Sequence, residues 1–195
     1  KSRIVNLVQK WNLPEDRKII MLPARFTEWK GHEFLIEALT KVKSEFCCIL
    51  VGSDHGHNQF RERIESKIIE SKLDGKVKMV GLCQDMPAAY AISNVVISSS
   101  IRPEAFGRIS IETQSFGKII IATKIGGSLE TIIDEKTGFL VFPGDSGKLA
   151  ELIDKVLNLS ESEANEIGLA ARDNVEKNFS CKKMCEKTIE VYKSV

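Results

Sequence analysis

The sequence lacks the signatures of several common protein classes. No apolar run approaches the roughly 20 residues that a membrane-spanning helix needs, and the amino-terminal stretch does not resemble a signal peptide. The formal net charge of the 195 residues is only +1, which gives no reason to expect nucleic acid or a strongly acidic partner. The chain begins with Lys1 rather than Met, so we expect a piece of a longer protein.

Two kinds of catalytic motif are also missing. No Walker phosphate-binding loop is present, which counts against an NTPase, and no G-x-S-x-G elbow is present, which counts against a serine hydrolase. The histidines are His32, His55 and His57, and we expect no metal cluster because they have no evident carboxylate partners. His55 and His57 alternate in a polar loop, where solvated side chains are expected.

Cysteine is present but forms no recognisable framework. The five cysteines are Cys47, Cys48, Cys83, Cys181 and Cys185. An odd number without a C-x-x-C pair argues against both a disulfide framework and a zinc site. Cys47 and Cys48 lie in an apolar run and are expected to act as small hydrophobic residues. This usage predicts a reducing, cytoplasmic environment.

Short apolar runs alternate with helical patterns along the whole chain. Strands are expected at residues 18–22, 47–51, 77–80, 95–98, 118–122 and 138–142, and helical patterns fill the intervals and the carboxyl-terminal tail. Near-continuous apolar strands are typical of a parallel sheet buried on both faces, and right-handed crossovers place helices on both sides. The sequence therefore predicts an α/β fold, with residues 1–195 forming one Rossmann-like domain around a parallel six-stranded sheet.

In such folds ligands bind beyond the carboxyl ends of the strands, and the unusual loops of this chain fall at that edge. Arg25 and Lys30 share one of these loops, and a planar guanidinium together with a mobile ammonium suits a diphosphate. Gly31 beside them permits close backbone approach. Considered separately, each charge is more often an ordinary surface group; their shared position favours phosphate binding.

The stretch from Ser98 to Glu112 reads as strand, sharp loop and helix, with Glu104 in the loop and Glu112 on the helix. Free backbone N–H groups at a helix start form an anion site. Two carboxylates beside an anion site suit a ligand that carries both phosphate and hydroxyl groups, although a single glutamate is more often simply solvated. The apolar surface of this helix is expected from Ile109, Ile111, Thr113 and Phe116.

Gly126 and Gly127 follow the fifth expected strand and leave two interpretations open. Their amides can approach a phosphate group closely. Alternatively they form a tight turn in which Ser128 caps the next helix, with Glu130 as an acid in its first turn.

Together these residues resemble a known family. The order and spacing of Arg25…Lys30-Gly31, Arg102-Pro103-Glu104-Ala105-Phe106-Gly107…Glu112, Gly126-Gly127…Glu130 and Thr137-Gly138 resemble the C-terminal domain of retaining glycosyltransferases with the GT-B fold. The likeness runs from about residue 18 to residue 158, and Glu104 and Glu112 match the E-x7-E motif of the glycosyl transferases group 1 family. The resemblance implies one half of a GT-B fold that binds a nucleotide-activated sugar.

The resemblance also implies roles for the catalytic residues. Arg25 and Lys30 would neutralise the diphosphate, assisted by the amides near Phe106 and Gly107. Glu104 would accept hydrogen bonds from the hydroxyls of the transferred sugar. Enzymes of this kind usually work without a metal ion, because basic residues and helix dipoles stabilise the leaving diphosphate, so no metal or other cofactor is expected.

For the nucleoside, the resemblance implies that Glu112 holds the ribose hydroxyls and that Leu82, in the Gly81 loop, lies near the base. Arg108 stands where many relatives carry an aliphatic residue, and either contacts phosphate or points to solvent. Ser128-Leu129 replaces a commoner Ile-Pro, which puts the geometry of that loop in doubt.

The expected activity is transfer of a hexose from a nucleoside diphosphate sugar, such as a UDP- or GDP-hexose, to an acceptor hydroxyl with retention, in envelope polysaccharide or lipopolysaccharide synthesis. We expect the family's N-terminal acceptor domain to lie outside these 195 residues, and residues 179–195 to pack toward it. Any peripheral association with the inner face of the membrane would reside in that domain. The alternatives are another sugar-nucleotide enzyme, such as an epimerase or a phosphorylase, and a non-catalytic α/β binding module.

Overall fold

The computed structural model describes residues 2–53 and 58–194. Six strands form one parallel sheet in the order β3-β2-β1-β4-β5-β6. They are β1 (Lys18–Pro23), β2 (Phe46–Val51), β3 (Val77–Gly81), β4 (Val95–Ser98), β5 (Ile119–Thr123) and β6 (Phe139–Val141). The chain winds outward from β1 to β3, returns to β4 beside β1, and winds outward again. The predicted Rossmann-like sheet is therefore confirmed, with its topological switch point between β1 and β4.

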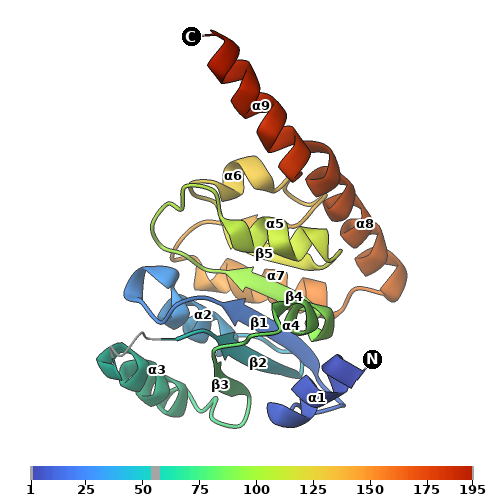
Figure 1. Cartoon of the computed structure of the whole chain (residues 1–195). Helices are drawn as coiled ribbons and strands as arrows, with labels where there is room; N and C mark the ends of the chain where they lie inside the picture. Colours follow the sequence, from blue (N-terminus) through green and yellow to red (C-terminus); the bar gives the residue numbers. More distant parts are fainter. Residues whose placement is uncertain (1, 54–57, 195) are drawn as a thin grey trace.

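Helices cover both faces of the sheet (Figure 1). They are α1 (Ser2–Lys10), α2 (His32–Leu39), α3 (Asn58–Glu70), α4 (Met86–Ile92), α5 (Arg108–Ser115), α6 (Ser128–Thr131), α7 (Ser146–Leu157), α8 (Glu161–Asn178) and α9 (Cys181–Ser194), with a short 3-10 helix, η1 (Glu28–Lys30). One face packs against α2, α3 and α7, and the other against α1, α4 and α5. Helix α9 projects away from the sheet (Figure 1). Only η1 was not expected, because three residues are too short to show helical periodicity.

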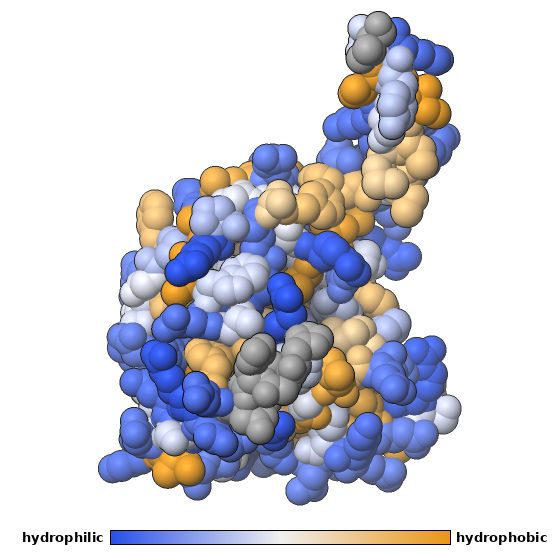
Figure 2. Space-filling view, turned by 60° about the vertical axis from the view of Figure 1, so that its left-hand side comes forward, coloured by the Kyte–Doolittle hydropathy of each residue, from blue (hydrophilic) through white to orange (hydrophobic). Residues whose placement is uncertain are grey.

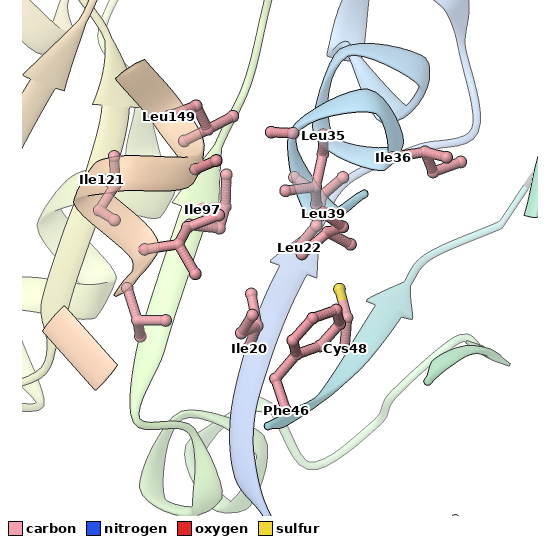
Figure 3. Packing of buried hydrophobic residues seen from close by; sticks show 14 of the residues in the cluster. Ile20, Leu22, Leu35, Ile36, Leu39, Phe46, Cys48, Ile97, Ile121 and Leu149 are labelled. Atoms are coloured by element: carbon pink, nitrogen blue, oxygen red, sulfur yellow. The ribbon is translucent and has the colours of Figure 1, made fainter. Parts of the chain in front are cut away.

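The core is divided by the sheet into two hydrophobic clusters, because successive strand residues point to opposite faces. Ile20 and Leu22 of β1 pack with α2 and α7 on one face (Figure 3), whereas Ile19 and Met21 belong to the other cluster. Cys47 and Cys48 also divide between the two faces and are both buried. Burial raises the pKa of both thiols, so both cysteines act as small hydrophobic residues, as predicted.

The inner face of α5 is largely polar, which corrects part of the expected apolar surface, although Ile109 packs against a hydrophobic cluster and Thr113 is buried as expected. Its buried residues are Ser110, Thr113 and Gln114, whereas Phe116 is 42% exposed. Gln114 Nε2 donates to the carbonyl oxygen of Thr131 at 2.9 Å, and Asn174 Nδ2 donates to Gln114 Oε1 at 3.0 Å. Because α6 and α8 present these polar groups, buried hydrogen bonds join α5 to both of them.

Two glycines let α8 approach the end of α5 closely. A Cβ added to Gly168 would overlap the backbone carbonyl oxygen of Gly117, an atom that cannot move without shifting the backbone. Gly168 lies in the interior of α8, where alanine has a higher helix propensity than glycine. The close approach rather than helix propensity accounts for glycine here.

We expect Gly168→Ala to lower the free energy of unfolding by about 1–3 kcal/mol, because overpacking outweighs the gain in helix propensity of about 1 kcal/mol. Gly147→Ala is the matched control, since the nearest atom to its added Cβ is 3.7 Å away. The control is expected to be neutral or stabilising by about 0.5 kcal/mol. Urea unfolding measures both, and a stabilised Gly168→Ala variant would contradict the tight packing.

His32, the first residue of α2, is fully buried. Its ring stacks on Phe26 with a centroid distance of 4.9 Å, and neither ring nitrogen has a hydrogen-bond partner among the described residues. Burial, together with the nearby ammonium of Lys30, lowers the pKa of His32 to about 4. The imidazole is therefore neutral in the folded chain at neutral pH.

This lowered pKa predicts a pH dependence of stability. The unfolded state binds a proton near pH 6.5 and the folded state only near pH 4, so stability present above pH 6.5 is lost as pH falls toward 4. We expect His32 to account for a loss of roughly 2–3 kcal/mol between pH 7.5 and pH 4.5. His32→Phe keeps an aromatic ring without a titrating group, and urea unfolding of this variant should show a loss smaller by that amount. If the free energy of unfolding of both proteins falls equally with pH, the lowered pKa of His32 is not the cause.

Candidate functional site

A buried ion pair joins the loops that follow β1 and β4. Lys30, the last residue of η1, places its Nζ 2.8 Å from Oε1 of Glu104, and the two side chains are only 9% and 20% exposed. The same Nζ lies 4.2 Å from the centroid of the Trp29 ring. The pair forms because β1 and β4 are neighbours in the sheet although they are far apart in the sequence. Two residues predicted to contact the ligand are therefore brought together at the switch point.

Two serines after β4 hold this pair, and the sequence analysis assigned them no role. Ser100 Oγ donates a hydrogen bond to Glu104 Oε1, and Ser99 Oγ lies 3.0 Å from the carbonyl oxygens of both Lys30 and Gly31. Oε1 of Glu104 thus accepts from both Lys30 and Ser100, and no described residue forms a hydrogen bond or ion pair with Oε2. The sequence offers one signal for Ser99 and Ser100: both follow directly after a strand at the switch point.

Gly31 is needed for contact between two protein loops. Its φ is 70°, and a Cβ would overlap the carbonyl oxygen of Ser99. The Ile101 amide also donates to the carbonyl oxygen of Trp29 at 2.8 Å. The absence of a side chain at Gly31 therefore lets the loop after β4 lie against its backbone.

Gly126 and Gly127 support the same loop from its other side. A Cβ on Gly126 would lie 2.5 Å from the Glu104 carbonyl oxygen, and one on Gly127 would lie 2.5 Å from the carbonyl carbon of Phe106. The Gly127 amide donates to the Glu104 carbonyl oxygen at 2.8 Å. The predicted cap was wrong: Gly127 is the N-cap of α6, and Ser128 instead donates its hydroxyl to the Ile125 carbonyl oxygen at 2.7 Å. Both glycines serve contact with the Glu104 loop.

The second carboxylate has different partners. Glu112 Oε2 accepts a hydrogen bond from the Tyr90 hydroxyl at 2.8 Å, and its Oε1 lies 3.0 Å from Nη2 of Arg108. The Glu112 side chain is 37% exposed and that of Arg108 is 84% exposed. Burial, followed by the hydrogen bond to Glu112, raises the pKa of Tyr90 above its usual range. Arg108 thus pairs with Glu112, and Tyr90 is a further residue that sequence reasoning missed.

The remaining candidates lie at the same edge without joining either pair. Arg25 follows β1 and is exposed, and no ion pair or side-chain hydrogen bond engages it within residues 2–53 and 58–194. Gly81 ends β3 with a φ of 72°, and Leu82 after it is 69% exposed. The expectations for His55 and His57 fall outside the described residues.

The loop before α5 presents one aromatic side chain. Phe106 is 47% exposed, and its ring packs edge-on against Phe179 with centroids 6.0 Å apart. Gly107 has a φ of 71° and is the N-cap of α5, so its left-handed conformation turns the loop into the helix. The start of α5 therefore lies between Glu104 and Glu112, where the predicted anion site requires it.

A hollow of about 640 Å³ lies next to η1 but is separate from both pairs. Trp29 and Gly31 line it, whereas neither Lys30 nor Glu104 does. Arg63 of α3 and Glu33 of α2 also line it, and Nη2 of Arg63 lies 2.7 Å from Oε2 of Glu33. The hollow therefore adjoins the Lys30–Glu104 pair without including it.

The described residues hold neither a cluster of metal ligands nor a membrane-spanning helix. No group of three or more histidine, cysteine, aspartate or glutamate residues is arranged for a metal ion in the part of the chain that the structure describes. No described helix combines the length and the apolar character needed to cross a membrane.

The chain is similar to several known proteins. It is 41% identical to a glycosyltransferase of Rickettsia africae, whose crystal structure matches with a TM-score of 0.95 over 99% of this chain and 52% of that one. It is 28% identical to HepE of Anabaena, solved with UDP-glucose, with a TM-score of 0.91 over 100% of this chain and 53% of that one. It is 29% identical to the capsular polysaccharide biosynthesis glycosyltransferase CapM of Staphylococcus aureus, over 92% of this chain and 47% of that protein.

These matches have two consequences. The chain spans about half the length of the relatives it matches, and the fold is one half of a GT-B glycosyltransferase. The model of the family described as glycosyl transferases group 1 matches residues 5–173, so the chain belongs to that family.

Proposed function

We propose that the chain is the donor-binding half of a retaining glycosyltransferase that moves a hexose from a nucleoside diphosphate sugar to an acceptor hydroxyl. The observation that carries this proposal is the buried Lys30–Glu104 pair at the carboxyl edge of the sheet, beside the switch point. The similarity to HepE, a structure solved with UDP-glucose, supports a nucleotide sugar as the ligand.

Lys30 supplies the positive charge at the diphosphate. Its ammonium has three donors, of which Glu104 accepts one, so two remain for phosphate oxygens. Because the side chain is buried, its charge acts through a medium of lower dielectric than water and stabilises the negative charge that develops on the leaving diphosphate. Arg25 adds an exposed guanidinium after the same strand, and the amides at the start of α5 add the helix dipole.

The two carboxylates bind the two sugars of the donor. Glu104 uses Oε1 for Lys30 and Ser100, so its Oε2 accepts from hydroxyls of the transferred hexose. Glu112 accepts from the ribose hydroxyls, and Leu82 contacts the base through its exposed side chain. This arrangement orients the donor by charge and hydrogen bonds, and no metal ion is required for it.

We place the acceptor-binding site in another domain, and helix α9 offers a surface for contact with that domain. Helix α9 has no buried residue among those described, and Met184, Ile189, Val191 and Tyr192 on it are all more than half exposed. Apolar side chains stand out on this projecting helix (Figure 2). We assign this surface to contact with an N-terminal acceptor domain of the same enzyme, because the chain covers about half of its relatives.

The acceptor class follows from the relatives rather than from this chain's geometry. The similarity to CapM supports a role in envelope polysaccharide synthesis, and related lipopolysaccharide enzymes fit the same proposal. We propose on this basis that the enzyme works in the cytoplasm, with any contact at the inner face of the membrane made through its acceptor domain.

Calorimetric titration with UDP and GDP tests the proposed site. We expect Lys30→Ala to weaken binding of the preferred nucleotide by about 1.5–3 kcal/mol, or roughly 10–150-fold, because a hydrogen bond to a charged group is lost. Lys124→Ala is the matched control, since it removes an exposed lysine after β5 at the same sheet edge, and it should change the affinity little. Equal affinities of Lys30→Ala and the unmodified chain would remove Lys30 from the site.

The chain alone should bind the nucleotide but transfer no sugar, because orientation of an acceptor hydroxyl requires the other half. The measurement is release of UDP from UDP-glucose in the presence of simple sugars and sugar alcohols. Sustained release that depends on an added acceptor would disprove the need for a second domain.

A further inference from the structure

Tyr90 has no role in the proposed function so far, yet its surroundings are unusual. It lies on α4, in the crossover from β3 to β4, and its side chain is only 1% exposed. Its ring stacks on Phe116 with centroids 5.3 Å apart and an interplanar angle of 15°. Its hydroxyl donates to Glu112 Oε2 at 2.8 Å. A buried tyrosine hydroxyl needs a polar partner, and here that partner is a carboxylate at the candidate site.

The hydrogen bonds of Glu112 show which acceptor positions on its two carboxylate oxygens are taken. An ionised carboxylate has about two acceptor positions on each oxygen. Tyr90 occupies one on Oε2, and Arg108 occupies one on Oε1. Among the residues that the structure describes, no other partner takes the second position on either oxygen, and this is the arrangement needed to accept hydrogen bonds from two neighbouring hydroxyls.

Tyr90 and Arg108 do not hold Glu112 equally firmly. The Arg108 side chain is 84% exposed, and an exposed pair of this kind on one helix contributes little. Tyr90 comes from a different helix, and its ring is buried in the hydrophobic cluster on its face of the sheet. Its raised pKa keeps the hydroxyl protonated, so that it remains a donor. Tyr90 is therefore the contact that sets the orientation of the carboxylate.

We propose that Tyr90 is a positioning residue that orients Glu112 toward the vicinal hydroxyls of a ribose, so that the site selects ribonucleotides over nucleotides that lack these hydroxyls. The inference rests on the proposed function, in which Glu112 binds the ribose. Tyr90 itself does not touch the ligand. Removing its hydroxyl therefore affects only ligands that engage Glu112.

The test compares Tyr90→Phe with the unmodified chain in calorimetric titrations. The ligands are UDP and GDP and their 2′,3′-dideoxy analogues, which keep the base and diphosphate. We expect Tyr90→Phe to weaken binding of the preferred ribonucleotide about tenfold, the usual effect of one hydrogen bond to a charged group, and to leave the dideoxy affinity unchanged. The preference for ribose should therefore shrink by the same factor.

Phe116→Leu is the structural control, because it removes the stacking partner and leaves both ends of the Tyr90–Glu112 hydrogen bond in place. We expect it to lower the melting temperature while preserving most of the preference for ribose. Equal weakening of ribose and dideoxy binding by Tyr90→Phe overturns the inference and leaves the proposed function standing. Failure of the unmodified chain to bind either UDP or GDP overturns the proposed function and the inference with it.

A second measurement needs no substitution and covers the case in which Tyr90→Phe does not fold. The chain has two tyrosines, and the other, Tyr192, is 78% exposed on α9. With 3-fluorotyrosine incorporated, the fluorine resonance of buried Tyr90 should shift on addition of the ribonucleotide and stay in place with the dideoxy analogue, while Tyr192 serves as an internal reference. Identical shifts of Tyr90 with both ligands would refute the inference.

Discussion

The buried pairing of Lys30 with Glu104 is the interaction on which the rest of the site depends. A charge removed from water is costly unless a partner of opposite sign stands close by, so the loops after β1 and β4 must be held at a fixed separation. The backbone provides this fixed separation: Gly31 lies against the Ser99 carbonyl, and hydrogen bonds from Ser99 and Ile101 join η1 to the loop. The parallel neighbours β1 and β4 bring the two loops together in the first place.

The same constraint explains the glycines on the other side of the Glu104 loop. Gly126 and Gly127 allow the turn before α6 to lie against the backbone of Glu104 and Phe106, and the Gly127 amide donates to the Glu104 carbonyl. The loop is thus in close backbone contact with Gly31, after η1, at one end and with the turn before α6 at the other. Buried hydrogen bonds from Gln114 then fasten α6 to α5. A carboxylate on such a loop is held before any ligand arrives, which reduces the cost of ordering it on binding.

Glu104 and Glu112 are the same residue type and lie close in the sequence, but they differ in burial and in hydrogen-bond partners. Glu104 is mostly buried, and a lysine and a serine share one of its oxygens. Glu112 is more exposed, and a buried tyrosine and an exposed arginine each take one of its oxygens. The first arrangement couples a carboxylate to a buried cation, which suits a position next to a diphosphate. The second leaves one acceptor position on each oxygen, which suits a pair of hydroxyls.

The sequence by itself determined the six strands, the helices between them and the edge at which the unusual loops gather, because the period of the apolar residues and the positions of glycine and proline are local properties. It also indicated Lys30 and Glu104 through their place after strands. Only the tertiary structure decided which side chains meet. The role of Ser100, the contact of Tyr90 with Glu112 and the polar inner face of α5 all depend on neighbours distant in sequence. Ser128 shows the same limit, because its hydroxyl bonds the Ile125 carbonyl oxygen and Gly127 is the N-cap of α6.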